Sequence, residues 1–254
     1  MRRGLPSLTA QRVAAYRLSF DRLATPYGDP AADEALARDV AGQVPGEPSE
    51  IMAHYLQART TFFDRVVINA IEREVSQVVM LGAGYDGRAL RYANPTVRWW
   101  EVDHPKTQQD KRVRLRRLGI TAEHVTFLGH DLEGGGLAAA LIESGFQPGV
   151  PSLVCCEGLV VYLQQDAVEL ALAELRSVAA PGTRLAISLA TSRDDDNTAE
   201  RRQRFEAAVA ALGEPARTRL SAEGAVGLFA RRGWRPVEMS ERSQRAGFVV
   251  VIPA

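Results

Sequence analysis

The feature that most constrains this chain is a glycine-rich turn that directly follows a run of apolar, mostly β-branched residues. Residues 78–81 read Val-Val-Met-Leu, and before a helical pattern begins they are followed by Gly82, Ala83 and Gly84. Glycine adopts positive φ without strain and lets a ligand approach the main chain, while the first turn of a helix offers unpaired N–H groups. The strand, turn and helix therefore predict an α/β sheet that binds a nucleotide cofactor at this turn.

A second predicted strand ends in carboxylates, 19 residues past Gly84. It carries Glu101 and then Asp103, and a carboxylate at this position can accept hydrogen bonds from both hydroxyls of a ribose. We predict Asp103 as the ribose contact, with Glu101 on the same face of the strand as the alternative. The alternative role for Asp103 is the N-cap of a helix before Pro105.

The glycine turn fits two classes of cofactor. Gly82, Gly84 and Gly87 match the G-x-G-x-x-G pattern of dinucleotide sites, which also carry an acid about 20 residues on. Dinucleotide-binding domains usually begin with this strand, whereas a long and mostly helical segment precedes it here. The only lysines are Lys106 and Lys111, and neither follows a tyrosine by four, so the Tyr-x-x-x-Lys pair of short-chain dehydrogenases is absent. These observations favour S-adenosylmethionine over NAD(P).

Strand and helix patterns alternate along the chain after the first glycine turn. Ahead of that turn, helical patterns cover about residues 8–23, begin near Asp29 and Pro30, and run from about 49 to 72. Proline is favoured in the first turn of a helix, which supports the second of these starts. Seven strands are predicted, at residues 76–81, 97–102, 124–129, 151–156, 184–190, 234–239 and 246–252.

This alternation predicts an α/β fold, a Rossmann-like, doubly wound and mostly parallel sheet of seven strands with an N-terminal helical cap. We expect one domain over residues 1–254. Its predicted parts are the cap (1–74), a cofactor-binding core (75–190) and an acceptor-side segment with the last two strands (191–254). The ligand is expected at the carboxyl ends of the strands, near the point where the strand order reverses.

Composition narrows the classes of partner. The 31 basic and 31 acidic residues leave no net charge to attract nucleic acid. No apolar run reaches the 18 or more residues of a membrane helix, and no export signal is visible, so we expect a cytoplasmic protein with no membrane partner. Cys155 and Cys156 are adjacent in an apolar strand and should point to opposite faces, which predicts neither a disulfide nor a metal site. The sequence leaves open a homo-oligomer.

Four motifs follow one another along the chain: Leu-Gly-Ala-Gly-x-Asp-x-Arg-Ala at 81–89, Glu-Val-Asp-x-Pro at 101–105, His-Asp-Leu at 130–132 and Cys-Glu-Gly-Leu-Val-Val-Tyr-Leu at 156–163. In this order they resemble the leucine carboxyl methyltransferase family, a branch of the class I S-adenosylmethionine enzymes that includes bacterial polyketide O-methyltransferases of natural-product pathways. Two shorter signals agree, Leu-Thr-Ala at 8–10 and Arg-Thr-Thr-Phe-Phe-Asp at 59–64. The chain departs from the common bacterial pattern at Tyr85 and Gly87, where leucine and threonine are usual.

The resemblance implies roles for two charged residues. Glu157 follows an apolar strand, so its carboxylate should emerge at the carboxyl edge of the sheet, where a charge needs a partner. By resemblance, Glu157 contacts the amino end of the methyl donor and Arg59 holds a carboxylate, with that of the donor as the first candidate. We take Glu157 and Tyr162 as the candidate catalytic residues, although Tyr162 fits a place in the core as well as one near the acceptor.

Asp131 and Leu132 follow the third predicted strand. The carboxylate of Asp131 can accept from an adenine amino group, and the Leu132 N–H can donate to a ring nitrogen. We therefore add both to the predicted cofactor contacts. The alternative for Asp131 is the cap of a helix that begins near Gly134.

The acceptor is the least determined part of the interpretation. No histidine follows the fourth strand, and a carboxylic acid, unlike a phenol, is already ionised near neutrality and needs no base. The sequence thus predicts an O-methyltransferase for a carboxylate of a small molecule, polyketide or peptide, with acceptor shape read by the helical cap and residues 191–220. A phenol or hydroxyl acceptor with His130 or His104 as base is the alternative; an NAD(P) oxidoreductase and a noncatalytic cofactor-binding protein are the others.

Overall fold

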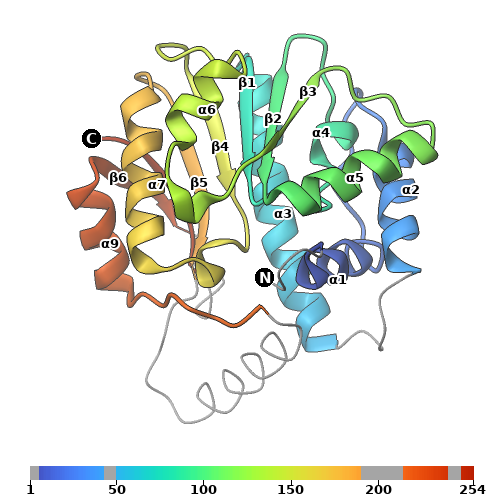
Figure 1. Cartoon of the computed structure of the whole chain (residues 1–254), viewed down its shortest axis with the longest axis horizontal. Coiled ribbons are helices and arrows are strands. Elements are labelled where there is room, and N and C mark those ends of the chain that lie inside the picture. Colours follow the sequence, from blue (N-terminus) through green and yellow to red (C-terminus); the bar gives the residue numbers. More distant parts are fainter. Residues whose placement is uncertain (1–5, 43–49, 190–213, 240–246) are drawn as a thin grey trace.

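The protein contains a single seven-stranded sheet covered by helices on both faces (Figure 1). The computed structural model describes residues 6–42, 50–189, 214–239 and 247–254. The strand order is β3-β2-β1-β4-β5-β7-β6, and all pairs are parallel except those of β7 with β5 and β6. The strands are β1 (Gln77–Leu81), β2 (Arg98–Asp103), β3 (Val125–Gly129), β4 (Ser152–Cys156), β5 (Arg184–Leu189), β6 (Trp234–Met239) and β7 (Gly247–Pro253).

The register of the central strands brings their carboxyl ends to one edge of the sheet. Leu81, the last residue of β1, lies opposite Val102 of β2 and Cys156 of β4. The segments that follow β1, β2 and β4 therefore begin next to one another at this edge. The chain runs outward from β1 through β2 to β3 and then returns to β4 on the other side of β1, so the order reverses between β1 and β4, where ligands bind in open α/β sheets.

Helices on both faces explain why the central strands are apolar throughout. One face of the sheet packs against α6, α7 and α9, and the other packs against α3 and α4. Cys156 belongs to the first core and Cys155 to the second, as the alternation of side chains along a strand predicts. The helices are α3 (Glu50–Glu72), α4 (Arg88–Arg91), α5 (Pro105–Arg117), α6 (Leu137–Glu143), α7 (Gln165–Val178) and α9 (Ala222–Arg231), with short 3₁₀ turns η1 (Leu132–Gly134) and η2 (Val160–Tyr162).

Two N-terminal helices, α1 (Leu8–Tyr16) and α2 (Pro30–Ala41), lie at the edge of the sheet where the parallel strands end (Figure 1). Each has a side-chain cap: Ser7 accepts from the Ala10 N–H and Asp29 from the Ala32 N–H, both at 3.0 Å. They share a small apolar core with the start of α4 and with α5. This arrangement places α1 directly over the glycine turn.

The fold class and the positions of the strands are confirmed, each strand end within one residue of its prediction where it is described. The helix predicted over 8–23 is wrong in length, because it ends at Tyr16 and the next arginines, Arg17 and Arg22, turn inward to carboxylates. The predicted cap over 1–74 includes α3, which packs on the sheet itself. Among the helices that the structure describes, none is long and apolar enough to cross a membrane.

Candidate active site

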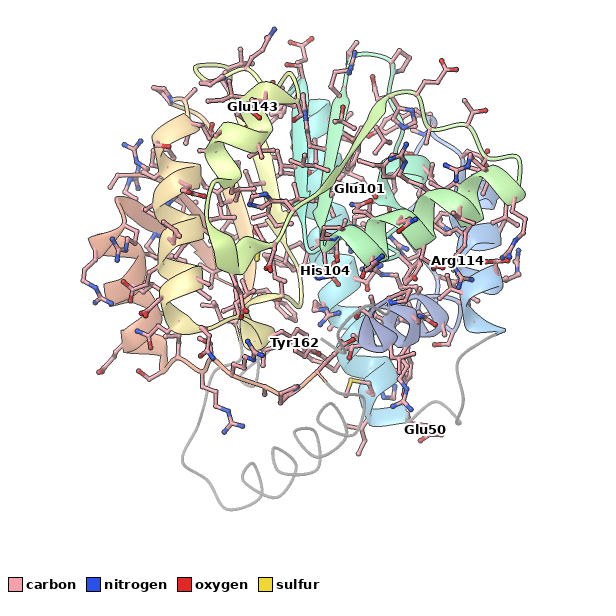
Figure 2. All side chains as sticks on the ribbon, in the orientation of Figure 1. Glu50, Glu101, His104, Arg114, Glu143 and Tyr162 are labelled. Atoms are coloured by element: carbon pink, nitrogen blue, oxygen red, sulfur yellow. The ribbon has the colours of Figure 1, made fainter. Side chains whose placement is uncertain are left out.

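A pocket of about 520 Å³ opens at the carboxyl edge of the sheet. The glycine turn after β1 and the residues that follow β2, β3 and β4 form its floor, and α1 with residues 214–217 forms its other wall. Figure 2 shows His104 and Tyr162 at this edge, whereas Glu143 lies at the opposite one. Of the predicted site residues, the pocket lining includes Arg59, Gly82, Ala83, Gly84, Asp103, Asp131, Leu132, Glu157 and Tyr162.

The glycine turn has the backbone conformation that its sequence predicts. Gly82 and Gly84 have φ of 64° and 52°, which residues with a side chain rarely adopt. The space around them is also small. A Cβ on Gly82 would lie 2.9 Å from Leu159 Cδ1, and one on Gly84 would lie 2.8 Å from the Ala10 Cβ of α1. Glycine is therefore required twice over, by conformation and by the close approach of α1 and the loop after β4.

Asp103 connects the glycine turn to the end of β2. Its Oδ2 accepts from the Gly84 N–H and its Oδ1 from the His104 N–H, both at 2.7 Å. The helix cap considered for Asp103 is provided by His104 instead. Burial raises the pKa of Asp103 above its ordinary value, and the two backbone N–H groups oppose that rise. Each carboxylate oxygen retains a further lone pair, so the side chain can still accept from a ribose.

Glu101 is placed differently from the other predicted contacts. Its carboxylate lies 2.5 Å from Lys111 Nζ, which also donates to the Asp86 carbonyl at 2.6 Å, and Glu101 is not part of the pocket lining. Burial raises the Glu101 pKa and Lys111 opposes the rise. The geometry argues against Glu101 as a ribose contact, because its carboxylate is paired with Lys111 behind the turn.

Asp131 and Leu132 line the pocket where β3 ends. Asp131 Oδ1 accepts from the Glu133 N–H at 3.1 Å and so caps η1. The predicted capping role and a place in the pocket are thus both present, and the second oxygen of Asp131 has no hydrogen bond to a described residue that competes for it.

Glu157 is surrounded by three guanidinium groups. Its Oε1 accepts from Arg59 Nε at 2.8 Å and from Arg17 Nη2 at 3.2 Å, and its Oε2 accepts from Arg88 Nη1 at 2.5 Å. Burial alone would raise the pKa of Glu157, but the three cations outweigh it and hold the pKa well below its ordinary value. The carboxylate is ionised at any physiological pH.

Arg88 is the centre of this cluster. It is fully buried and contacts Asp64 and Asp86 as well as Glu157, at 2.6, 2.5 and 2.5 Å. The ion pairs continue outward from Asp64, and every side chain in the set is at most 9% exposed. The set contains five arginines and four acids: Arg17, Arg22, Arg59, Arg88 and Arg91 with Asp33, Asp64, Asp86 and Glu157.

This buried arginine–carboxylate cluster therefore has one positive charge in excess. At its surface end Arg91 also meets Glu34, but Glu34 in turn pairs with Arg38, so the excess remains. Arg17 and Arg59 are the members of the cluster that are positively charged and line the pocket. Both arginines already pair with Glu157, and their remaining N–H groups suit a ligand that brings a carboxylate.

Comparison with known proteins identifies the family. The model of the leucine carboxyl methyltransferase family matches residues 9–176. The chain belongs to this family. Relatives named "Putative S-adenosyl-L-methionine-dependent methyltransferase" include one from Mycobacterium marinum, 37% identical over 192 residues, and one from Parafrankia sp., 34% identical over 181 residues. These alignments cover 70% and 66% of this chain, which spans 63% and 55% of the relatives' own length.

Solved structures support the same fold. A putative methyltransferase from Thermobifida fusca YX aligns over 99% of this chain and 96% of its own, with a TM-score of 0.63 and 17% identity. Magnesium protoporphyrin IX methyltransferase from Synechocystis PCC 6803, solved with bound SAH, aligns over 83% and 90%, with a TM-score of 0.55 and 13% identity. The predictions of the family and of the class I methyltransferase fold are confirmed.

One departure from the common pattern of the leucine carboxyl methyltransferases has a structural reason. A Cβ on Gly87 would lie 1.8 Å from Asp33 Oδ1, because α2 packs against the start of α4. Threonine does not fit there while Asp33 accepts from Arg91 and Arg22. The second departure, Tyr85, donates from its hydroxyl to Asp110 at 2.5 Å and packs in the core of α1, α2 and α5.

Three aromatic or imidazole groups lie around the rest of the pocket in this family member. Burial raises the pKa of Tyr162 to about 12, so at neutral pH its hydroxyl is a proton donor and not a base. His104 Nδ1 accepts from the Lys106 N–H at 3.3 Å, which leaves its Nε2 to carry the proton in the neutral ring. His130 Nε2 is buried and has no hydrogen-bond partner among the described residues.

Residues 214–218 close the pocket on the side of α1. Glu214 accepts from Ser7 Oγ and from the Leu8 N–H, both at 3.0 Å, so its carboxylate sits at the N-terminus of α1. The Arg217 N–H donates to the Val161 carbonyl at 2.7 Å, next to Tyr162. Most of the predicted acceptor-side segment, residues 190–213, lies outside the described residues. The described residues contain no group of three His, Cys, Asp or Glu side chains placed to hold a metal ion.

Sequence reasoning missed Arg17, Arg88, Asp86 and Asp64. Asp86 and Arg88 are part of the glycine-turn motif and Asp64 closes the short motif at 59–64. The available signal was a set of charged residues inside otherwise apolar segments, because such residues are rarely buried without partners. Arg17 carried no comparable signal. Its position depends on where α1 ends and on the packing of α1 over the sheet edge.

Proposed function

We propose that this chain is an S-adenosylmethionine-dependent O-methyltransferase whose acceptor is a carboxylate on a small molecule, polyketide or peptide. The observation that carries the proposal is the contrast within one pocket. Its inner part holds Asp103 and the guanidinium groups of Arg17 and Arg59, and its outer part holds hydroxyl donors, of which that of Tyr162 stays protonated.

The inner part suits the methyl donor group by group. Asp103 has the lone pairs for the ribose hydroxyls, and Asp131 with the Leu132 backbone has the donor and acceptor pattern for adenine. Arg17 and Arg59 supply the positive charge for the donor's carboxylate. Glu157 holds both arginines in place, and its ionised carboxylate favours the nearby ammonium and sulfonium. S-adenosylmethionine supplies the methyl group as an electrophile.

The outer part needs to orient the acceptor and does not need to deprotonate it. A carboxylate is ionised near neutrality, with a pKa about 4, whereas a phenol has a pKa near 10. Tyr162 stays protonated. His104 uses the lone pair of Nδ1 to cap the helix that follows it, so in the neutral ring Nε2 carries the proton and has no lone pair to offer. Orientation of two reactants is worth about 7–11 kcal/mol in favourable systems, which is enough for placement to be the main contribution of the protein.

A phenolic acceptor is the second candidate, and one observation favours it. His130 lines the pocket and its Nε2 has no partner in the part of the chain that the structure describes, so it is the imidazole best placed to accept a proton. In that case the reaction rate at low acceptor concentration rises with pH. With a carboxylate acceptor it stays flat from about pH 6 to 8.

The decisive experiment is a screen of carboxylates and phenols for donor consumption, followed by location of the new methyl by mass spectrometry. Mild alkali cleaves a methyl ester and leaves an aryl methyl ether intact. We expect the best acceptor to give an alkali-labile product; an alkali-stable product rejects the carboxylate and promotes the phenol. Calorimetry that finds NADH bound more tightly than S-adenosylmethionine or S-adenosylhomocysteine would reject the methyltransferase itself.

A further inference from the structure

Thr9 carries a polar group that the site described so far does not use. It is the second residue of α1 and lines the pocket. Its Oγ1 is buried and has no partner with hydrogen-bond geometry among the described residues. A buried hydroxyl without a partner is unfavourable, so a ligand that accepts its hydrogen bond is favoured at this position.

The neighbours of Thr9 place it in the outer part of the pocket. Its hydroxyl lies close enough to Tyr162 to oppose the rise of the tyrosine pKa. On one side Ala10 packs against Gly84, and on the other Ser7 is hydrogen-bonded to Glu214. Thr9 is therefore held between the glycine turn, where the donor binds, and the segment that closes the pocket.

The charges at this end have partners that do not depend on a ligand. The Glu214 carboxylate accepts from Ser7 Oγ and from the Leu8 N–H at the start of α1. Arg217 forms an ion pair with Glu133 at 2.6 Å. The groups left to meet an acceptor are the hydroxyls of Thr9 and Tyr162 and the imidazoles of His104 and His130. Neutral donors suit a carboxylate that reacts with a sulfonium, because both charges disappear during transfer and a tightly bound cation would stabilise the starting carboxylate more than the transition state.

We propose that Thr9 is an acceptor-binding residue: its hydroxyl, beside that of Tyr162, donates to the non-reacting oxygen of the acceptor carboxylate. The inference rests on the proposed function and names the group that orients the acceptor. The other carboxylate oxygen attacks the methyl carbon, the carbon–sulfur bond breaks with its electron pair going to sulfur, and an ester and S-adenosylhomocysteine form. No proton is released, so the two hydroxyls act as donors throughout.

The test uses the full chain saturated with S-adenosylhomocysteine and titrated with benzoate or phenol in a calorimeter. Thr9→Val removes the hydroxyl and keeps the shape, and Thr9→Ser keeps the hydroxyl. Thr60→Val is the matched control, because Thr60 Oγ1 is also buried without a partner but Thr60 does not line the pocket. Thr9→Ala replaces Thr9→Val if the valine variant does not fold.

We expect wild-type protein to prefer benzoate, and Thr9→Val to weaken benzoate about tenfold, the size of one hydrogen bond to a charged group. Thr9→Ser and Thr60→Val should bind benzoate as wild type does, and all variants should keep their affinity for S-adenosylhomocysteine within about twofold. Preference of the wild type for phenol, or no binding of benzoate, overturns the carboxylate acceptor itself. Preference for benzoate that Thr9→Val leaves unchanged, or an equal loss of S-adenosylhomocysteine affinity, overturns the role of Thr9 alone.

Discussion

The two ends of the pocket are built from opposite kinds of polar group. At the donor end, buried arginines and carboxylates neutralise one another through many ion pairs, and Arg88 alone meets three acids. At the end proposed for the acceptor, the lining includes Thr9, Tyr162, His104 and His130, and the ion pair of Arg217 with Glu133 is at least one third exposed.

The difference shows how one fold serves a constant donor and a variable acceptor. A network of buried ion pairs is rigid, because moving one member leaves its partners unpaired in a medium of low dielectric constant. Such a network fixes the donor end before any ligand arrives. Hydroxyl donors cost less to bury and impose less on their ligand, so the acceptor end is free to change with the acceptor.

The largest effect is expected at Arg88. Arg88→Met leaves Asp64, Asp86 and Glu157 short of a buried counterion, so the free energy of unfolding should fall by about 3–5 kcal/mol. Chemical denaturation of the variant and the wild type measures this loss. The matched control is Arg38→Met, whose ion pair with Glu34 is 65% and 41% exposed and should contribute at most about 1 kcal/mol. Equal losses for both variants would remove the distinction between a rigid buried cluster and ordinary surface charges.

A smaller effect is expected at Asp103. Asp103→Asn should weaken binding of S-adenosylhomocysteine by about 1–3 kcal/mol, because the ribose hydroxyls lose a charged acceptor. Glu101→Gln should leave binding nearly unchanged and lower stability instead, since Lys111 loses its buried partner. Calorimetry and denaturation separate the two effects. If Glu101→Gln weakens binding more than Asp103→Asn, the ribose contact has been assigned to the wrong acid.

The pH dependence of binding should distinguish Asp103 from Glu157. Burial raises the folded-state pKa of Asp103 above its ordinary value of 3.8. In the ligand-free protein this carboxylate therefore gains a proton in mild acid, and the protonated form binds ribose less well. The folded-state pKa of Glu157 is lowered, so its contribution to stability is present above its unfolded-state pKa and is lost only in strong acid. Affinity for S-adenosylhomocysteine should thus fall at a pH where the protein is still folded. Asp103→Asn should abolish that fall; a fall of the same size in the variant would assign it to another group.

The smallest effect is expected at His104. With a carboxylate acceptor, His104→Ala should change the rate by less than about threefold, whereas loss of a general base costs roughly 10²–10⁴-fold. His130→Ala, assayed in parallel on the same acceptor, covers the other imidazole of the pocket. A loss of a hundredfold in either variant would mean that the acceptor end contains a base after all.

The residues of the donor end that lie at strand ends could be predicted from the sequence, whereas Arg17, Arg88 and their partners Asp64 and Asp86 could not. The glycine turn, Asp103 and Asp131 each follow a strand that its apolar pattern locates within one residue, and parallel strands bring their carboxyl ends to one edge. Glu101 was the exception. Alternation along the strand puts Glu101 on the same face as Asp103. Only the packing of α5 shows that Lys111 binds the Glu101 carboxylate, which therefore is not available to a ribose.

The sequence by itself determined the order of strands and helices, the turn that needs glycine and the position of Asp103, because these depend on local patterns of apolar residues and on backbone geometry. Tertiary structure decided which charges pair with one another and which side chains line the pocket. Arg17, Arg59 and Arg88 come from three separate helical segments and meet only at Glu157. Thr9 reaches Tyr162 across more than half of the chain because α1 folds back over the sheet edge. Such contacts depend on how helices pack, and no periodicity in the sequence encodes that packing.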